Sequence, residues 1–263
     1  MDLGLKGRRA LVTGSTAGIG FSIARTLARE GAHVVINGRT QARVDQAIER
    51  IKADVPGAQL SGVAADLSSA AGVDQLIARM GTLDILVNNA AVFEPKAFGD
   101  ITDADWTRFF ETNVMSGVRL SRASLPGMLE RNWGRIVFIS SESGKQIPVE
   151  MIHYGMTKSA QLAVARGLAE STRGTAVTVN SVLPGPTASE GVGEFVKQMA
   201  AQNKVSEKEM EHQFFTTARP SSIIQRFLTT DEVASMVAYI VSEAASGTNG
   251  SSLLVDGGVV RSI

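Results

Sequence analysis

The chain has 263 residues whose 26 basic and 26 acidic side chains cancel, so it can bury a substantial core and, without any basic block, is not expected to bind nucleic acid. The absence of cysteine excludes disulfides, thiolate metal sites and a thiol nucleophile. No segment reaches the roughly 20 apolar residues that cross a bilayer, and the polar start is not a secretion signal, so we expect a cytoplasmic protein without membrane contact that binds a small molecule.

Short apolar runs recur along the chain, separated by amphipathic stretches with helical periodicity. Apolar runs of this kind are typical of parallel strands whose two faces are both covered. Their alternation with helices predicts a doubly wound, Rossmann-type α/β fold, with a seven-stranded parallel sheet, helices on both faces and a single domain. The predicted strands are 9–13, 33–37, 59–64, 85–88, 135–140, 177–183 and 252–255, and the main predicted helices are 19–30, 41–53, 103–131, 154–171 and 231–241.

The first predicted strand ends in a glycine-rich turn, Thr13-Gly-Ser-Thr-Ala-Gly-Ile-Gly20, and a predicted helix follows at once. Glycines let a diphosphate approach the backbone, and free N–H groups at a helix start favour its negative charge. In this context the turn predicts a dinucleotide site. Gly14, Asn89, Ser141 and Gly185 all follow predicted strands, so we expect them to converge at the carboxyl edge of the sheet.

The second predicted strand ends at Asn37, and Gly38 and Arg39 follow it. An acidic residue at this point would bond the 2′-hydroxyl of a ribose and repel a 2′-phosphate. Gly38 stands where that acid is expected, and the Arg39 guanidinium is available for a phosphate. The sequence therefore predicts NADP(H) in preference to NAD(H), with a merely solvated Arg39 as the alternative.

Tyr154 and Lys158 lie four positions apart on a predicted helix and therefore share one face. A nearby ammonium, together with the positive charge of a nicotinamide, would lower the pKa of the phenol from its usual value of about 10. Such a phenol can exchange a proton with a developing alkoxide while the cofactor exchanges a hydride. These residues predict the interconversion of a ketone and a secondary alcohol.

The stretch 186–230 is a long connection, and connections of this length are usually functional or mobile. It contains two short helical patterns, at 193–203 and 206–216, each with an apolar and a charged side. We interpret it as a lid over the substrate, with ordinary surface helices as the alternative. The apolar side comprises Phe195, Met199, Met210, Phe214 and Phe215, and the charged side Lys204, Glu207, Lys208, Glu209 and Glu211.

Over nearly its whole length the chain resembles the short-chain dehydrogenase/reductase family, including its 3-oxoacyl-[acyl-carrier-protein] reductases. The glycine turn has the spacing Thr-Gly-x-x-x-Gly-Ile-Gly, Asn88-Asn-Ala-Ala91 is similar to the family's Asn-Asn-Ala-Gly, and Val255-Asp-Gly-Gly258 is similar to its C-terminal strand and turn. The resemblance implies four catalytic residues, namely Asn113, Ser141, Tyr154 and Lys158.

The resemblance also implies a role for each of these residues. Ser141 polarises the substrate, Lys158 also bonds the nicotinamide ribose, and Asn113 holds a water and a local helix distortion for a proton relay. Asp66 and Leu67 are implied to contact the adenine, Asn89 to lie near the ribose, and Thr187 to contact the carboxamide. The implied cofactor-binding residues are Gly14, Ser15, Thr16, Ala17, Gly18, Ile19, Gly20, Arg39, Asp66, Leu67, Asn89, Tyr154, Lys158 and Thr187.

Substrate contacts are expected from the loop before Tyr154, although solvent-facing loop positions are an equally weighted alternative. The candidates are Glu142, Gln146, Met151 and His153, and no histidine has metal-ligand spacing. We expect an NADP(H)-dependent reductase of a ketone, including a 3-oxoacyl compound. An NAD-dependent sugar or polyol dehydrogenase and a catalytically silent nucleotide-sensing module are the alternatives. Family resemblance at the C-terminus further implies a homo-oligomer, either a dimer or a tetramer.

Overall fold

Seven parallel strands form one sheet in the spatial order β3-β2-β1-β4-β5-β6-β7. The computed structural model describes residues 2–203 and 205–262, apart from the side chains of residues 194, 195 and 198. The order reverses direction between β1 and β4, as in a doubly wound fold, and confirms the predicted fold class. The strands are β1 (Arg9–Val12), β2 (His33–Gly38), β3 (Leu60–Ala64), β4 (Ile85–Asn88), β5 (Gly134–Ile139), β6 (Val177–Pro184) and β7 (Ser252–Val255).

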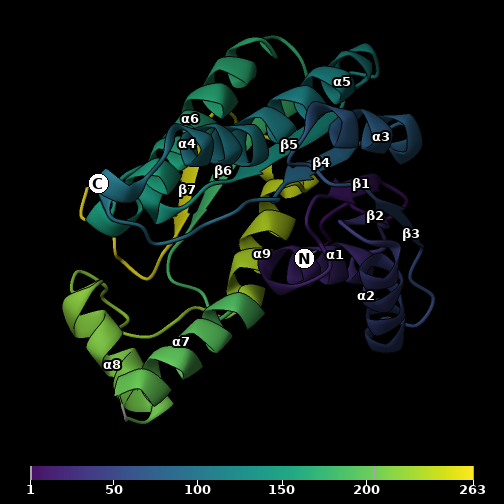
Figure 1. Ribbon diagram of the computed structural model, residues 1–263. Coiled ribbons are helices and arrows are strands. Elements are labelled where there is room, and N and C mark those ends of the chain that lie inside the picture. The colour runs from purple at the N-terminus through teal and green to yellow at the C-terminus, as the bar shows by residue number, and fades with distance from the viewer. Residues whose placement is uncertain (1, 204, 263) are drawn as a thin grey trace.

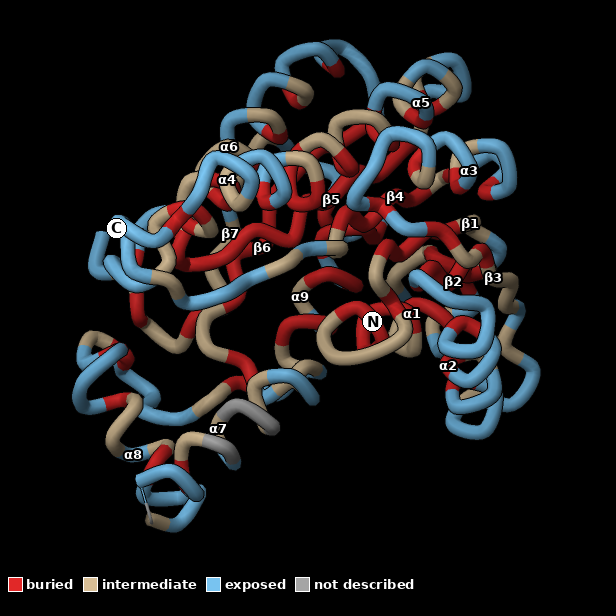
Figure 2. The backbone as a smooth tube through the Cα atoms, in the orientation of Figure 1, coloured by how far each residue is buried: buried red, intermediate tan, exposed pale blue. Residues whose placement is uncertain are grey.

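Helices cover both faces of the sheet, as Figure 1 shows. Alternate strand residues point to opposite faces, so Ala10 and Val12 pack into one core cluster and Leu11 into the other. The inner strands β2, β1, β4, β5 and β6 are buried almost throughout, whereas the edge strands β3 and β7 are partly exposed (Figure 2). One face is covered by α1 (Gly18–Arg29), α2 (Gln41–Asp54) and α9 (Thr230–Ile240), and the other by α3 (Ala70–Met80), α5 (Ser116–Glu130) and α6 (Ile152–Glu170).

The long helix predicted over 103–131 is interrupted. It consists of α4 (Asp103–Phe110), a π-helical turn (Glu111–Met115) and α5. The turn contains Asn113, so the local distortion implied there by the family resemblance is present. A π-helical turn widens the helix and frees a carbonyl from the regular ladder, and such turns are frequent at functional sites.

Two helices, α7 (Glu190–Asn203) and α8 (Glu207–Thr217), lie in the long connection predicted as a lid and project from the body of the molecule (Figure 1). We call residues 186–230 the α7–α8 segment. Its two ends lie side by side, because the Leu228 N–H donates to the Pro186 carbonyl at 2.8 Å. Within the segment, Phe214, Phe215 and Phe227 form an aromatic cluster. The predicted contribution of the Phe195 side chain and of Lys204 lies outside the described residues.

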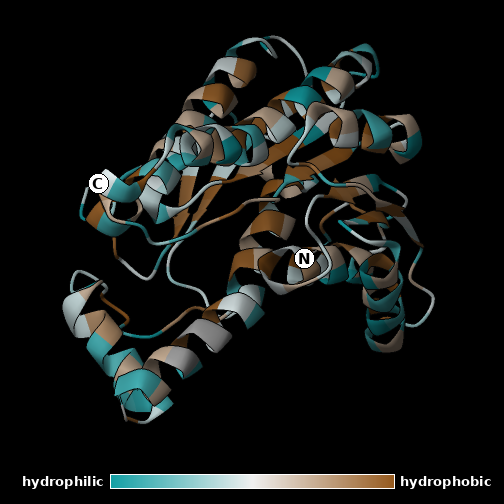
Figure 3. Cartoon of the chain, viewed as in Figure 1, coloured by the Kyte–Doolittle hydropathy of each residue, from teal (hydrophilic) through white to brown (hydrophobic). Residues whose placement is uncertain are grey.

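Hydrophilic and hydrophobic residues are mixed along these two helices (Figure 3). Met210 and Phe215 of α8 are buried. The amphipathic pattern therefore predicted two helices that the structure contains, each within about three residues of its expected bounds. No helix within the described ranges is long and apolar enough to span a membrane.

Candidate active site

The glycine turn between β1 and α1 leaves no room for side chains at its glycines, but it leaves the first N–H groups of α1 without a side-chain cap. Gly14 and Gly18 have φ values of 61° and 57°, in the left-handed region that favours glycine. A Cβ atom on Gly20 would lie 2.4 Å from the carbonyl oxygen of Gly14 and from the Asn89 amide nitrogen. Ala17, the residue before α1, makes no side-chain capping bond, so the first N–H groups of the helix are left for an anion. These features fit a dinucleotide pyrophosphate.

Neutral side chains hold this turn in place. The Asn37 amide oxygen accepts the Gly14 N–H at 3.2 Å, and the Ser15 N–H donates to the Asn37 carbonyl at 2.9 Å. The Asn89 amide nitrogen donates to the carbonyls of Thr13 at 2.9 Å and Gly14 at 3.2 Å. The structure therefore uses the Asn89 amide to tie the end of β4 to the turn, a role that the sequence did not reveal.

Gly38 occupies the position where an acidic residue would favour NAD(H), and the space beside it is taken by the Thr16 side chain. A Cβ atom on Gly38 would lie 2.4 Å from the Thr16 methyl group, so an acidic side chain does not fit there without a shift. Arg39 is exposed, and in the described parts of the chain its side chain forms no ion pair. Asp66 lies exposed beyond β3, beside buried Leu67. Thr187 is buried at the start of the α7–α8 segment, with its hydroxyl bonded to the Gly185 carbonyl at 2.9 Å.

Tyr154 and Lys158 lie in the first two turns of α6, on the side that meets the end of β5. The Lys158 ammonium nitrogen is 5.5 Å from the centre of the Tyr154 ring and donates to the Ile139 carbonyl at 2.8 Å. Ser141 follows β5, and its hydroxyl lies close enough to the Tyr154 hydroxyl to lower the pKa of the phenol. The neighbouring Ser140 hydroxyl donates instead to the Lys158 carbonyl at 2.8 Å, so it has a structural use. Structure and sequence therefore bring the same Ser, Tyr and Lys together.

The electrostatics differ from the expectation. In this structure burial and the negative charge of Glu142 raise the pKa of Tyr154, while the nearby Ser141 hydroxyl and the charge of Arg219 lower it. Burial also lowers the pKa of Lys158 to about 7. The predicted lowering of the phenol pKa by Lys158 is therefore not found in this structure, because the lysine is itself withdrawn from water.

A chain of buried amides connects Asn113 to Lys158. The Gln161 amide nitrogen donates to the Asn113 main-chain carbonyl at 2.6 Å, and its amide oxygen accepts from the Lys158 ammonium at 3.2 Å. The Asn113 side chain bonds both backbone groups of Val92, at 2.8 and 2.9 Å, and donates to the Thr157 hydroxyl at 3.0 Å. Gln161 thus lies between Asn113 and Lys158, and no motif in the sequence pointed to it.

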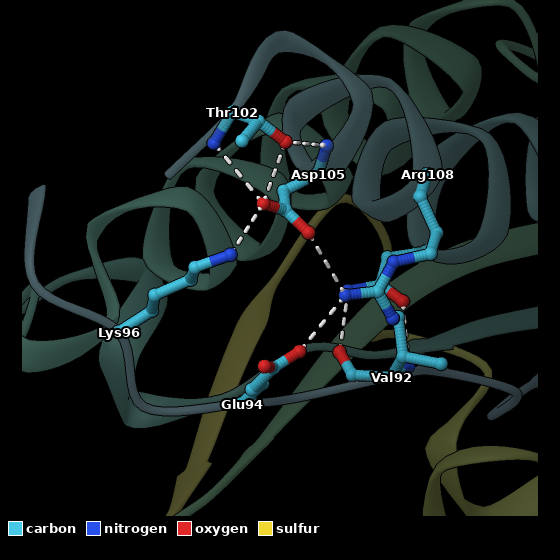
Figure 4. A network of polar contacts seen from close by, with 7 residues as sticks. Val92, Glu94, Lys96, Thr102, Asp105 and Arg108 are labelled. Atoms are coloured by element: carbon cyan, nitrogen blue, oxygen red, sulfur yellow. Dashed lines mark hydrogen bonds and ion pairs between the residues drawn. The ribbon is translucent and has the colours of Figure 1, made fainter. Parts of the chain in front are cut away.

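The loop after β4 that carries Val92 is anchored to α4 by charged side chains (Figure 4). The Lys96 ammonium lies 2.7 Å from the Asp105 carboxylate, and Arg108 pairs with Glu94 at 2.8 Å. Asp105 also completes the capping box at the start of α4. This anchoring places the Val92 backbone against Asn113.

The four candidate substrate residues have different environments. Glu142 is buried and paired with Arg219, and Gln146 is exposed and bonded to the Ser221 hydroxyl at 3.3 Å. Met151 is half-buried in the turn before α6. His153 is fully buried with its ring 4.0 Å from that of Phe109, and its nitrogens have no hydrogen-bond partner among the described residues, so its side chain belongs to the core and the expected substrate contact is not supported. No group of three or more metal-ligating side chains gathers within the described ranges.

A doubly wound sheet with a glycine turn and a Ser–Tyr–Lys group at its carboxyl edge defines a nicotinamide-dependent oxidoreductase. The family model for short chain dehydrogenases matches residues 8–200. The chain belongs to the short-chain dehydrogenase/reductase family, whose members use NAD(P) and act on CH–OH groups.

Similar proteins agree with this assignment. Uncharacterized oxidoreductase YvaG of Bacillus subtilis (strain 168) is 46% identical over 263 residues, with 100% of both chains covered. The structure of L-sorbose reductase from Gluconobacter frateurii with NADPH and L-sorbose matches with a TM-score of 0.93 at 31% identity over 100% of both chains. A variant of actinorhodin polyketide ketoreductase with NADPH matches with a TM-score of 0.87 at 32% identity, over 97% of this chain and 98% of that one. The likeness to ketoacyl reductases is therefore supported.

Proposed function

We propose that the protein is an NADP(H)-dependent oxidoreductase that interconverts a ketone, including a 3-oxoacyl compound, and a secondary alcohol. The observation that carries this proposal is the meeting of Ser141, Tyr154 and Lys158 at the end of β5, one strand away from the end of β4, where Asn89 contacts the glycine turn. The complete set of side chains also argues against a silent nucleotide-sensing module.

Each residue has a separate task in the proposed reaction. A bound nicotinamide supplies or accepts the hydride. Tyr154 donates the proton to the developing alkoxide, or accepts it in the reverse direction. Ser141 is the second hydroxyl that holds the substrate oxygen. Lys158 lies behind Tyr154, with its ammonium fixed by Ile139 and Gln161, and can return a proton to the phenol.

Backbone groups and small residues of the first two strands would hold the cofactor. The glycine turn receives the pyrophosphate at the start of α1, and Asp66 and Leu67 border the adenine. Two features support NADP(H) over NAD(H). The Thr16 methyl group leaves no room for an acidic side chain at position 38, and the exposed Arg39 guanidinium, which has no ion pair among the described residues, can bind a 2′-phosphate.

For the substrate, two candidate classes follow from the similar structures. The likeness to a polyketide ketoreductase supports a 3-oxoacyl compound as the substrate, and the likeness to L-sorbose reductase supports a sugar or polyol. Glu142, Gln146 and Met151 are the proposed residues near the substrate, and the α7–α8 segment is the proposed lid over it. The direct test is a spectrophotometric screen with NADPH and NADH against 3-oxoesters, diketones, cyclic ketones and sugars, then the reverse alcohols. Turnover of no carbonyl and no alcohol would refute the proposal.

We also propose a homo-oligomer, with a tetramer as the expected form and a dimer as the alternative. An apolar depression of about 480 Å³ lies on the outer face of α5 and α6. An exposed apolar patch of this kind is typical of a protein interface. Replacing Val164 with Glu should shift the mass measured by light scattering toward the monomer, whereas an unchanged mass would exclude this face. The lining residues are Val118, Arg122, Leu125, Pro126, Leu129, Val164 and Leu168.

A further inference from the structure

Glu142, the residue after Ser141, is a buried carboxylate with only 4% of its surface exposed. Its Oε2 atom accepts hydrogen bonds from the Ser141 hydroxyl and, at 2.8 Å, from the Ser143 N–H. Its Oε1 atom accepts one from Nε of Arg219 at 3.1 Å. A buried carboxylate is costly unless it is paired and hydrogen-bonded, so Arg219 supplies the charge partner that the burial of Glu142 requires.

Arg219 comes from a distant part of the chain, directly after the end of α8. It is 8% exposed, and its Nη1 atom donates to the Glu150 carboxylate at 3.1 Å and to the Ala218 carbonyl at 2.8 Å. Its guanidinium carbon lies 5.9 Å from the centre of the Phe214 ring. One side chain of the α7–α8 segment therefore bonds two carboxylates of the loop between Ser141 and α6.

We propose that Glu142 and Arg219 form a positioning pair that couples the α7–α8 segment to Ser141; this inference rests on the proposed oxidoreductase function. A serine hydroxyl has a single proton. While Ser141 donates that proton to Glu142, its oxygen only accepts, and it polarises a substrate carbonyl only after the proton turns away. Arg219 balances the carboxylate charge that holds the proton. The position of the α7–α8 segment thus controls how readily the Ser141 hydroxyl can turn from Glu142 to donate its proton to the substrate carbonyl.

The same pair sets the charge near Tyr154. Glu142 raises the pKa of the phenol and Arg219 lowers it, in addition to the effect of burial. Glu142 therefore keeps Tyr154 protonated, as ketone reduction requires, and Arg219 limits this effect so that oxidation is not blocked. The other charged or titratable groups near this end of α6 are Lys158, Glu150 and, on the side facing α4, His153 with Glu94, Lys96, Asp105 and Arg108 around it.

Two single substitutions test the pair because they change the local charge in opposite directions. In Arg219→Met an unbalanced carboxylate remains beside Tyr154, so the rising limb of kcat/KM against pH for alcohol oxidation should move up by about one pH unit. Glu142→Gln should move it down by about the same amount. The double variant should return toward the wild type. Shifts in the same direction, or no shift in either variant, would overturn the proposal.

A second measurement needs no turnover. The chain has two tyrosines, so Tyr239→Phe leaves Tyr154 as the only one. In this background, protein labelled with carbon-13 at tyrosine Cζ and saturated with NADP⁺ should show the same opposite shifts in the NMR titration of Tyr154. If the wild type oxidises no alcohol and these shifts persist, the proposed function fails and the pair stands. Identical titrations in all variants would refute the pair even in an active enzyme.

Two further variants keep the test decisive. Arg219→Lys retains the charge but has only one nitrogen to reach both carboxylates, so its shift should be smaller than that of Arg219→Met; it replaces that variant if Met prevents folding. Arg226→Met is the matched control, since Arg226 lies on the same segment and pairs with Glu232 at 2.8 Å on the surface. It should leave both titrations unchanged, and a shift of equal size there would overturn the special role of Arg219.

Discussion

The two ends of the site are held together by different kinds of interaction. At the cofactor end, amides and backbone groups hold the glycine turn through Asn37 and Asn89. At the substrate end, the charged pair of Glu142 and Arg219 holds the loop that carries Ser141. The neutral bonds join neighbouring strands of one sheet and do not change with pH. The charged pair joins residues 77 positions apart and depends on how the α7–α8 segment sits. We therefore expect the proposed cofactor end to be preformed and the proposed substrate end to be adjustable.

The largest effect is expected where the two ends meet, at Tyr154. Tyr154→Phe removes the proton donor and should lower kcat by about 10²–10⁴-fold. NADPH affinity, measured by fluorescence titration, should stay close to that of the wild type because the cofactor end is untouched. Tyr239→Phe on the surface of α9 is the control. Full activity in Tyr154→Phe would contradict the assigned role.

The preformed cofactor end should tolerate no extra atom at Gly20. In Gly20→Ala the new Cβ would lie 2.4 Å from a backbone oxygen, so the turn must shift. Overpacking of this kind costs about 1–3 kcal/mol, and a loss of that size in binding free energy would weaken NADPH binding about 5–150-fold. Gly167→Ala is the matched control, because that Cβ meets nothing within 4 Å on an exposed face of α6. It should leave binding unchanged and raise the melting temperature. Equal NADPH affinity in both variants would show that the turn is more flexible than the structure indicates.

Cofactor choice should depend on one exposed cation. Arg39→Ala loses charge-assisted hydrogen bonds to a 2′-phosphate, worth about 1.5–3 kcal/mol, so kcat/KM with NADPH should fall about 10–100-fold. The value with NADH should change little. Arg79→Ala, at the end of α3, serves as the control. An equal loss with both cofactors would mean that Arg39 supports the fold and does not read the phosphate.

The difference between the two ends also explains what the sequence could predict. The seven strands, the glycine turn and the Tyr154–Lys158 face depend on periodicity and short spacing, and the structure contains them all. No local pattern links Glu142 to Arg219, because that contact depends on where the α7–α8 segment folds.

Small shifts in helix bounds had larger consequences for individual side chains. We predicted a helix from Tyr154, but α6 begins at Ile152. His153 is therefore a helical residue that turns toward Phe109 in the core, and the loop position expected for it does not exist. Gln161 was missed for a related reason. Its amide bonds the Asn113 carbonyl inside the π-helical turn, and only the packing of that turn against α6 brings the two groups within reach.

The last predicted effect concerns stability alone and involves Lys158, whose partners are the neutral Ile139 carbonyl and the Gln161 amide. Burial lowers its pKa to about 7 from the usual 10.5. Between these values the unfolded chain binds more protons than the native protein, so the free energy of unfolding should rise with pH, by at most about 1.4 kcal/mol per pH unit. Lys158→Met should lack this contribution, so urea unfolding from about pH 7 to about pH 9 should show the wild type gaining stability relative to the variant. A lysine paired with a carboxylate would show the reverse trend. If the unfolding free energies of wild type and variant run parallel with pH, or the wild type loses stability relative to the variant, the neutral surroundings of Lys158 do not determine its charge.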